Sequence, residues 1–104
     1  MSYAIAFDLK TDLLKEHYGE NYGNAYGEIQ KFLEGNHYRR QQGSLYFGDE
    51  NTNAVHCVMT VQKLSEKFTW FHSCVSDIRM LRIEEDNDLK PALSLDALKK
   101  KGGK

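Results

Sequence analysis

The sequence lacks the features that mark membrane, secreted and disulfide-stabilised proteins. No apolar stretch approaches the ~20 residues that span a bilayer, and the N-terminus has no basic segment followed by a signal-type apolar run. Only two cysteines are present, Cys57 and Cys74, and neither belongs to a CxxC motif or stands at ligand spacing from a histidine. We therefore expect a cytoplasmic protein without membrane contact, whose two thiols are packed and unpaired.

Composition and charge divide the chain into two unequal parts. The 104 residues are 40% hydrophobic and include six tyrosines and five phenylalanines, which predicts one globular domain with a small core. Residues 1–89 hold nine basic and fourteen acidic side chains, whereas residues 90–104 hold five lysines and one aspartate. We assign a domain to residues 1–88 and a basic tail to residues 89–104. The tail is either a frayed, solvated terminus or a local phosphate contact.

Hydrophobic periodicity predicts a βαββαβ order of elements. The apolar run at residues 3–8 indicates a buried strand, and a short helical turn follows at 12–18. The remaining elements are a helix, two strands, a helix and a last strand, at residues 21–34, 37–42, 43–48, about 51–68, and 76–84. This order is that of the ferredoxin-like α+β fold, a four-stranded antiparallel sheet with two helices on one face. The first and third strands then lie in the centre, and the polar second strand lies at an edge.

Side-chain patterns within these elements give further expectations. Gly35 and Asn36 suit a left-handed helix C-cap. The last strand alternates polar and apolar residues and should bury one face. Helical spacing assigns two sets to the core, namely Tyr22, Tyr26, Ile29 and Phe32 from the first long helix and Val55, Val58 or Met59, Leu64 and Phe68 from the second. The histidines show no ligand spacing and are expected to be surface or structural residues, namely His17, His37, His56 and His72.

Asp8 is the most informative single residue, because it ends the buried strand at residues 3–8. A carboxylate at the mouth of such a strand is a common catalytic or metal-binding group, and it is equally well placed to cap the next helix. A ferredoxin-like sheet would bring Asp8 beside Ser44, at the start of the third strand. The fold hosts nucleases, sensors and RNA-binding modules, so the site must decide between them. Residues 43–48 lack the basic-Gly-aromatic opening of an RNA-recognition module.

Three segments together resemble the virulence-associated protein D family. They are Tyr3-Ala4-Ile5-Ala6-Phe7-Asp8-Leu9-Lys10, Gln42-Gly43-Ser44-Leu45-Tyr46 and the run from Val75 to Glu84, and they match the family in order and spacing over about residues 3–88. That family is itself similar to the CRISPR-associated Cas2 proteins. The resemblance implies a homodimeric endoribonuclease of the toxin type, often paired with a small antitoxin protein. It also implies a catalytic set, which is Asp8, Ser44 and Asp77. Ser76 departs from an arginine common in the family, and Asn36-His37 replaces its usual Gly-aromatic pair.

Two routes to RNA cleavage remain open for Asp8. If a twofold axis brings Asp8 of two chains together, the carboxylates would either hold a hard divalent cation such as Mg²⁺ or share a proton and supply a general base. Ser44 is a candidate hydrogen-bond donor to a phosphate oxygen, although it is equally suited to satisfying the backbone after Gly43. Asp77 is a candidate orienting carboxylate, although it is equally suited to pairing with Arg79.

Candidate substrate contacts lie near these residues in the predicted sheet. Lys10, Arg39 and Arg40 are candidates for phosphate contacts, and Tyr46 is a candidate for base stacking, with a place in the core as its alternative. Arg39 and Arg40 point to opposite faces of one strand, so at most one of them faces a given groove.

Two other functions are weighed against the nuclease. A non-catalytic, Cas2-like dimeric module would bind nucleic acid or an antitoxin protein without chemistry, through exposed aromatics at Trp70-Phe71 and the edge strand at residues 37–42. A sensor of small metabolites at a dimer interface is the weaker alternative, because the chain has no Gly-rich cradle or other ligand fingerprint.

Overall fold

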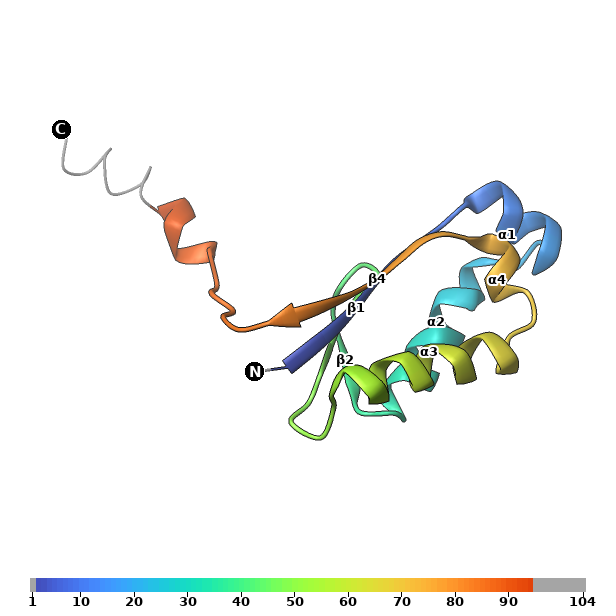
Figure 1. Ribbon diagram of the computed structural model, residues 1–104. Coiled ribbons are helices and arrows are strands. Elements are labelled where there is room, and N and C mark those ends of the chain that lie inside the picture. The colour runs from blue at the N-terminus through green and yellow to red at the C-terminus, as the bar shows by residue number, and fades with distance from the viewer. Residues whose placement is uncertain (1, 95–104) are drawn as a thin grey trace, which may run out of the picture.

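The computed structural model describes residues 2–94 (Figure 1). Four strands and four α-helices follow one another along the chain, and a short 3₁₀ helix closes the described part. Their bounds are β1 Ser2–Leu9, α1 Thr11–His17, α2 Gly23–Glu34, β2 Tyr38–Gln42, β3 Leu45–Gly48, α3 Ala54–Lys67, α4 Phe71–Cys74, β4 Val75–Ile83 and the 3₁₀ helix Lys90–Ser94. The predicted connection at residues 69–73 thus contains the start of a short helix, α4. The expected exposure of Trp70 and Phe71 is wrong, because Phe71 is a core residue and Trp70 packs against the core.

The strands form one antiparallel sheet in the order β2-β3-β1-β4, which is the ferredoxin-like arrangement that the sequence predicts. β1 pairs with β3 on one side and with β4 along its whole length on the other. The central position of β1 and β3 and the edge position of β2 are therefore confirmed. β4 forms the second edge.

The core lies between one face of the sheet and helices α2 and α3. Ile5 and Phe7 of β1 point toward these helices, where Ile29, Leu33 and Leu64 are fully buried. Because side chains alternate along a strand, Ala4, Ala6 and Asp8 point to the opposite face. The described helices α2 and α3 leave that face uncovered (Figure 1).

The predicted buried face of helix α3 is right in its second half and wrong in its first. Leu64 and Phe68 are buried as predicted, whereas Val55, Val58 and Met59 are 67%, 50% and 49% exposed, and Cys57 and Thr60 are buried in their place. The helix begins at Ala54, and the Asn53 side chain caps it by accepting a hydrogen bond from the His56 amide at 2.8 Å. This start fixes the rotation of the helix, and a small thiol and a hydroxyl take the inward positions.

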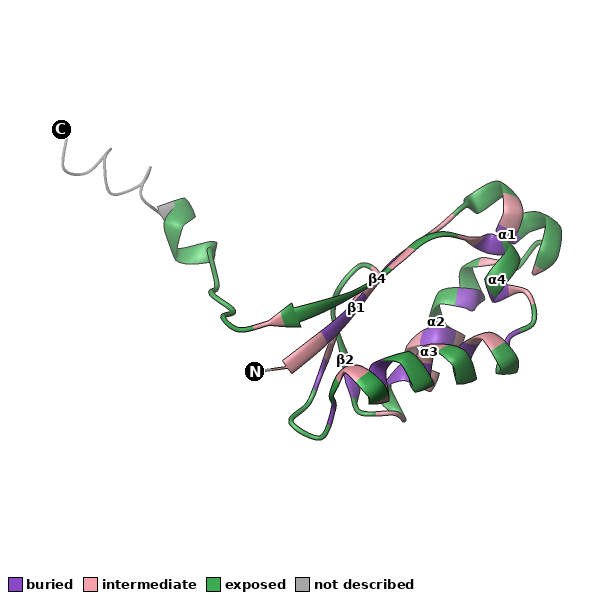
Figure 2. Ribbon diagram, viewed as in Figure 1, coloured by how far each residue is buried: buried purple, intermediate pink, exposed green. Residues whose placement is uncertain are grey.

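Three further expectations need correction. Gly35 has φ −72°, and the residue with a left-handed backbone is His37, at φ 78°. In α2, Tyr26 is 38% exposed, because it lies at the margin of the buried stripe. β4 buries its apolar face only in part and is drawn largely as exposed (Figure 2): Val75 and Ile78 pack against the core, whereas Met80 and Leu81 are 45% and 41% exposed. An edge strand that extends beyond the helices has no partner layer for its apolar side chains.

The chain leaves the sheet after β4 and runs away from the body (Figure 1). Leu89 and Leu93 are exposed in this segment. Of the predicted basic tail, residues 95–104 lie outside the described residues. Within residues 2–94, helices are all too short and too polar to cross a membrane. Cys57 and Cys74 are buried free thiols, as expected.

Candidate functional site

Three of the predicted site residues line one open groove at the end of the sheet. Asp8, Ser44 and Asp77 contribute to a cavity of about 500 Å³, together with the Gly43 turn. Asp8 and Asp77 are direct partners in the antiparallel pairing of β1 with β4. The Phe7 amide donates to the Ser44 carbonyl at 3.1 Å, which ties the turn before β3 to the last residues of β1. The sheet therefore brings together residues that are 36 and 69 positions apart from Asp8.

A β-bulge lies beside Asp77, at the edge of the groove. Asp8 pairs with Asp77, but the next residue, Leu9, pairs with Val75, so Ser76 is the extra residue. Its hydroxyl donates to the Asp8 carbonyl at 3.2 Å. Without an extra residue, Val75 and Asp77 would point to the same face. Bulges of this kind occur next to active sites, where they redirect a side chain.

The two carboxylates have unequal surroundings. Arg79 Nε lies 3.2 Å from both oxygens of Asp77, and this contact raises the pKa of the Arg79 guanidinium. Within residues 2–94, no side chain pairs with the Asp8 carboxylate, which is exposed. Like charges placed directly opposite each other destabilise a sheet. The opposition of Asp8 and Asp77 is therefore unfavourable for pairing of β1 with β4, and Arg79 offsets the charge of Asp77 alone.

Asp8 does not cap the following helix. The N-cap of α1 is Lys10, with no side-chain cap hydrogen bond, and the Lys10 amide donates to the Cys74 carbonyl at 2.9 Å. The structural alternative for Asp8 is thus removed, and the exposed Lys10 lies two residues beyond it at the same end of the sheet.

The two arginines of β2 lie apart, as their alternation predicts. Arg40 Nε donates to the Gly43 carbonyl at 2.8 Å, which holds the guanidinium at the turn beside Ser44. Arg39 lines a different cavity, near the start of β1. Of the two, only Arg40 is near the Asp8 groove.

Tyr46 is a core residue, so the prediction of base stacking on its ring is wrong. Its side chain is 2% exposed and stacks on Phe7 with the ring centroids 6.1 Å apart. Burial also raises the pKa of its hydroxyl. A nucleobase has no access to a ring face that is packed in this way.

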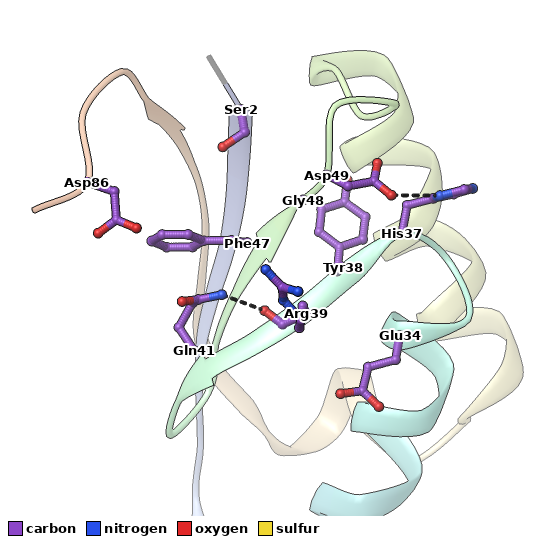
Figure 3. A pocket seen from close by; sticks show the side chains of 10 residues that line it. All are labelled: Ser2, Glu34, His37, Tyr38, Arg39, Gln41, Phe47, Gly48, Asp49 and Asp86. Carbon is purple, nitrogen blue, oxygen red and sulfur yellow. Dashed lines mark hydrogen bonds and ion pairs between the residues drawn. The ribbon is translucent and has the colours of Figure 1, made fainter. Parts of the chain in front are cut away.

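A second polar cluster, unpredicted from the sequence, lies at the opposite end of the sheet (Figure 3). His37 Nδ1 lies 3.0 Å from Asp49 Oδ2, and the Tyr38 hydroxyl lies 3.2 Å from His56 Nδ1. The backbone amide of Asn51, more than His37, holds the pKa of Asp49 below its usual value. A cavity of about 460 Å³ adjoins this cluster. Residues 37, 49 and 56 follow no motif, so no spacing could have linked them.

Few side chains of the kind that bind metals lie close together in the described part of one chain. Among residues 2–94 no group of three or more histidine, cysteine, aspartate or glutamate side chains could hold an ion. Asp8 and Asp77 together provide two carboxylates of the kind that hard cations prefer. Within the described residues, one chain thus brings two such carboxylates together and no larger group.

Comparison with known proteins identifies clear relatives, although no family model matches. The chain is 53% identical over 93 residues to "Endoribonuclease VapD 2" of Riemerella anatipestifer, covering 88% of this chain and 99% of that protein. It is 50% identical over 93 residues to "Endoribonuclease VapD homolog" of Helicobacter pylori, covering 89% and 97%. It is 44% identical over 86 residues to "Endoribonuclease VapD" of Dichelobacter nodosus, covering 83% and 90%.

Proposed function

The chain belongs to the VapD family of endoribonucleases, and from this premise we propose that it cleaves single-stranded RNA in the Asp8 groove as a cytoplasmic homodimer. It is an RNA-cleaving hydrolase. The observation that carries the choice of site is the pairing of Asp8 with Asp77 across two strands, beside Ser44. Carboxylates set opposite each other are unfavourable in a sheet, and this favours a functional reason for keeping the pair.

Each groove residue has a role that its surroundings support. Asp8 carries the unpaired carboxylate and is our candidate for general base or metal ligand. Asp77 is held by Arg79 and serves as the second, orienting carboxylate. Ser44 donates a hydrogen bond to a phosphate oxygen, and Arg40 and Lys10 offset the charge of the phosphate groups. We leave Arg39 out of this set, because it faces another cavity.

A divalent cation such as Mg²⁺ would complement the pair of carboxylates. When bound, it would activate water and polarise a phosphoryl oxygen. Asp8 is the residue we expect to hold it, with Asp77 as a further oxygen ligand. Since one chain provides only two carboxylates, a second chain would complete the shell. Without a metal, neighbouring carboxylates of two chains would share a proton and supply the base.

The uncovered face of the sheet supports the proposed dimer. We call this surface the open face, and its apolar residues are Ala4, Ala6, Leu45, Phe47 and Leu81, which lie opposite one another in register. None of the three larger ones belongs to the core: Leu81 is 41% exposed, and Leu45, Phe47 and Ala6 are partly buried, whereas Ala4 is fully buried. A contiguous apolar surface of this kind marks an interaction site. Asp8 lies at the end of the open face, so a twofold axis there would bring the two groove ends near each other.

A small antitoxin protein is a further proposed partner. The exposed side chains of Val55, Val58 and Met59 on α3 lie away from the open face, so they stay available in such a dimer. They would suit an apolar segment of the antitoxin.

The experiment that tests the function is gel-resolved cleavage of a defined single-stranded RNA by highly purified protein. Wild type and Asp8→Asn are compared with Mg²⁺ and with chelator, beside a DNA of the same sequence. We expect cleavage of RNA by wild type alone, and the chelator lanes separate the metal from the general-base route. Equal cleavage by both proteins would remove Asp8 from the active site. Intact RNA that still binds either protein would favour a non-catalytic binding module.

A further inference from the structure

A second, smaller cavity adjoins the Asp8 groove. Its volume is about 270 Å³, and it lies between α2 and the edge strand β2. The Gly43-Ser44 turn lines both this cavity and the groove, so the two are separated by that turn alone. The other lining residues come from α2, β2 and β3, namely Tyr26, Gly27, Gln30, Arg40 and Tyr46. A ligand bound in the groove can therefore place a neighbouring chemical group in this second cavity.

Tyr26 gives this cavity an exposed aromatic wall. It belongs to the same helix as Ile29 and Leu33, which are fully buried, but its own side chain is 38% exposed. An aromatic ring with an accessible face is the usual platform on which proteins stack an unpaired nucleobase. Tyr46, buried below, forms part of the wall but offers no free face.

Arg40 is fixed beside this ring with donors to spare. Its Nε donates to the Gly43 carbonyl at 2.8 Å, which orients the guanidinium at the turn. The two Nη groups carry the remaining N–H donors of the fork. Such a fork matches the two acceptors on the outer edge of guanine, O6 and N7.

The turn itself leaves room for a ligand. Gly43 has φ +50°, and a Cβ placed there would have no atom within 4 Å. The backbone at this point is therefore open to close approach from outside.

We propose that the cavity lined by Tyr26 and Arg40 is a nucleobase subsite, which takes the base of a nucleotide next to the scissile phosphate. The base stacks on Tyr26, and Arg40 reads its edge, with guanine as the best match. The inference rests on the proposed function, because it assumes that RNA occupies the Asp8 groove. The subsite lies on the side of the sheet away from the open face, since Arg40 pairs with Tyr46 on the core side. It therefore remains accessible in the proposed dimer.

The first test measures binding without cleavage. Asp8→Asn protein is titrated, by fluorescence anisotropy, into uridine octamers that carry a single central guanine, adenine or cytosine, or none. We expect the guanine octamer to bind most tightly and Tyr26→Leu to weaken its binding about tenfold or more, as removal of one stacked base does. Arg40→Gln should remove the guanine preference. Tyr26→Phe keeps the ring and should bind like the parent.

Arg39→Gln is the matched control. It removes the same charge from the residue that precedes Arg40 in β2, whose side chain lies on the opposite face of the sheet. Its effect should be the same for all four octamers and below that of Arg40→Gln. Circular dichroism and thermal unfolding establish that each variant is folded. Equal binding of the guanine octamer by Tyr26→Leu and its parent would overturn the subsite. An effect of Arg40→Gln that is equal for all four octamers would overturn base reading by that arginine.

A second measurement separates this inference from the proposed function. The cut positions produced in a random-sequence RNA are compared between wild type and Tyr26→Leu. We expect a base preference beside the cut that Tyr26→Leu weakens. An unchanged preference, with cleavage intact, would overturn the subsite alone. If wild type fails to cleave while guanine-dependent binding still requires Tyr26, the nuclease function falls and the subsite stands.

Discussion

The two ends of β1 treat charge in opposite ways. At one end, Asp8 faces Asp77; Asp77 pairs with Arg79 of its own strand, whereas Asp8 has no side-chain partner within residues 2–94. At the other end, His37 meets Asp49 and Tyr38 meets His56, so that each polar group faces a complementary one. The ends are about 20 Å apart, the length of six residues in a strand. Complementary contacts explain the polar residues of the His37 end by stability, whereas the opposed carboxylates of the Asp8 end have no such explanation.

Asp8→Asn tests most directly whether the Asp8 end serves catalysis and not stability. The change is nearly isosteric and removes a charge that opposes Asp77, so we expect the free energy of unfolding to stay level or rise slightly. Cleavage of RNA should fall at least a hundredfold, in the range for loss of an acid–base group. Urea unfolding and initial rates, measured on one preparation, test both parts. A large loss of stability would mean that the Asp8 end is structural after all.

Ser44→Ala should have a smaller effect at the same end. Loss of one hydrogen bond at a reacting centre typically costs about tenfold to a thousandfold in rate. The Phe7 amide bonds to the backbone carbonyl of residue 44, which alanine retains, so folding should be unaffected. The measurement is kcat on saturating RNA. A rate equal to wild type would return Ser44 to a structural role.

Gly48→Ala tests the opposite end, where we expect stability to change and chemistry to be spared. A Cβ at this position would collide with the Thr52 side chain, whose Cβ and Cγ2 would be 2.9 Å away. Overpacking of this kind costs about 1–3 kcal/mol. Thermal unfolding gives the loss, and cleavage measured well below the melting temperature should match wild type. Unchanged stability would show that Thr52 can turn away at little cost.

Asp49→Asn should produce the smallest effect, and one that depends on pH. The pKa of Asp49 is lowered in the folded protein, chiefly by the Asn51 amide and then by His37. A lowered folded-state pKa stabilises the fold above the unfolded-state value, near 3.8, and this contribution is lost as the pH falls through the folded-state value. The variant should therefore be less stable than wild type at neutral pH, with the difference shrinking in acid. Urea midpoints across the acid range provide the check, and a constant difference would contradict the assignment.

Local signals in the sequence were sufficient for the order of the elements and for the sheet. The apolar run of β1 and the polar run of β2 fix a central and an edge strand. That topology alone places Asp8 beside Ser44. The burial of individual side chains depended instead on how each helix is rotated about its axis and on contacts between residues that are distant in the sequence. The Asn53 cap sets which side of α3 faces the core. Tyr26 is exposed because it lies at the margin of the buried stripe of α2. The polar cluster of His37, Asp49 and His56 joins the start of β2, the end of β3 and α3, and no periodicity in the sequence indicates such contacts.

The extra residue in β4 has a consequence for how this chain tolerates change. Ser76 works as a spacer: it lets Val75 pack beneath the helices while Asp77, two positions later, turns to the groove. What matters there is that a residue is present, more than which residue it is, because the Ser76 side chain is exposed. Position 76 should therefore accept many substitutions and no deletion. A one-residue loss would place Val75 and Asp77 on the same face, so that either Val75 leaves the core or Asp77 leaves the groove. The chain length between Val75 and Asp77 therefore keeps one residue in the core and the other in the groove.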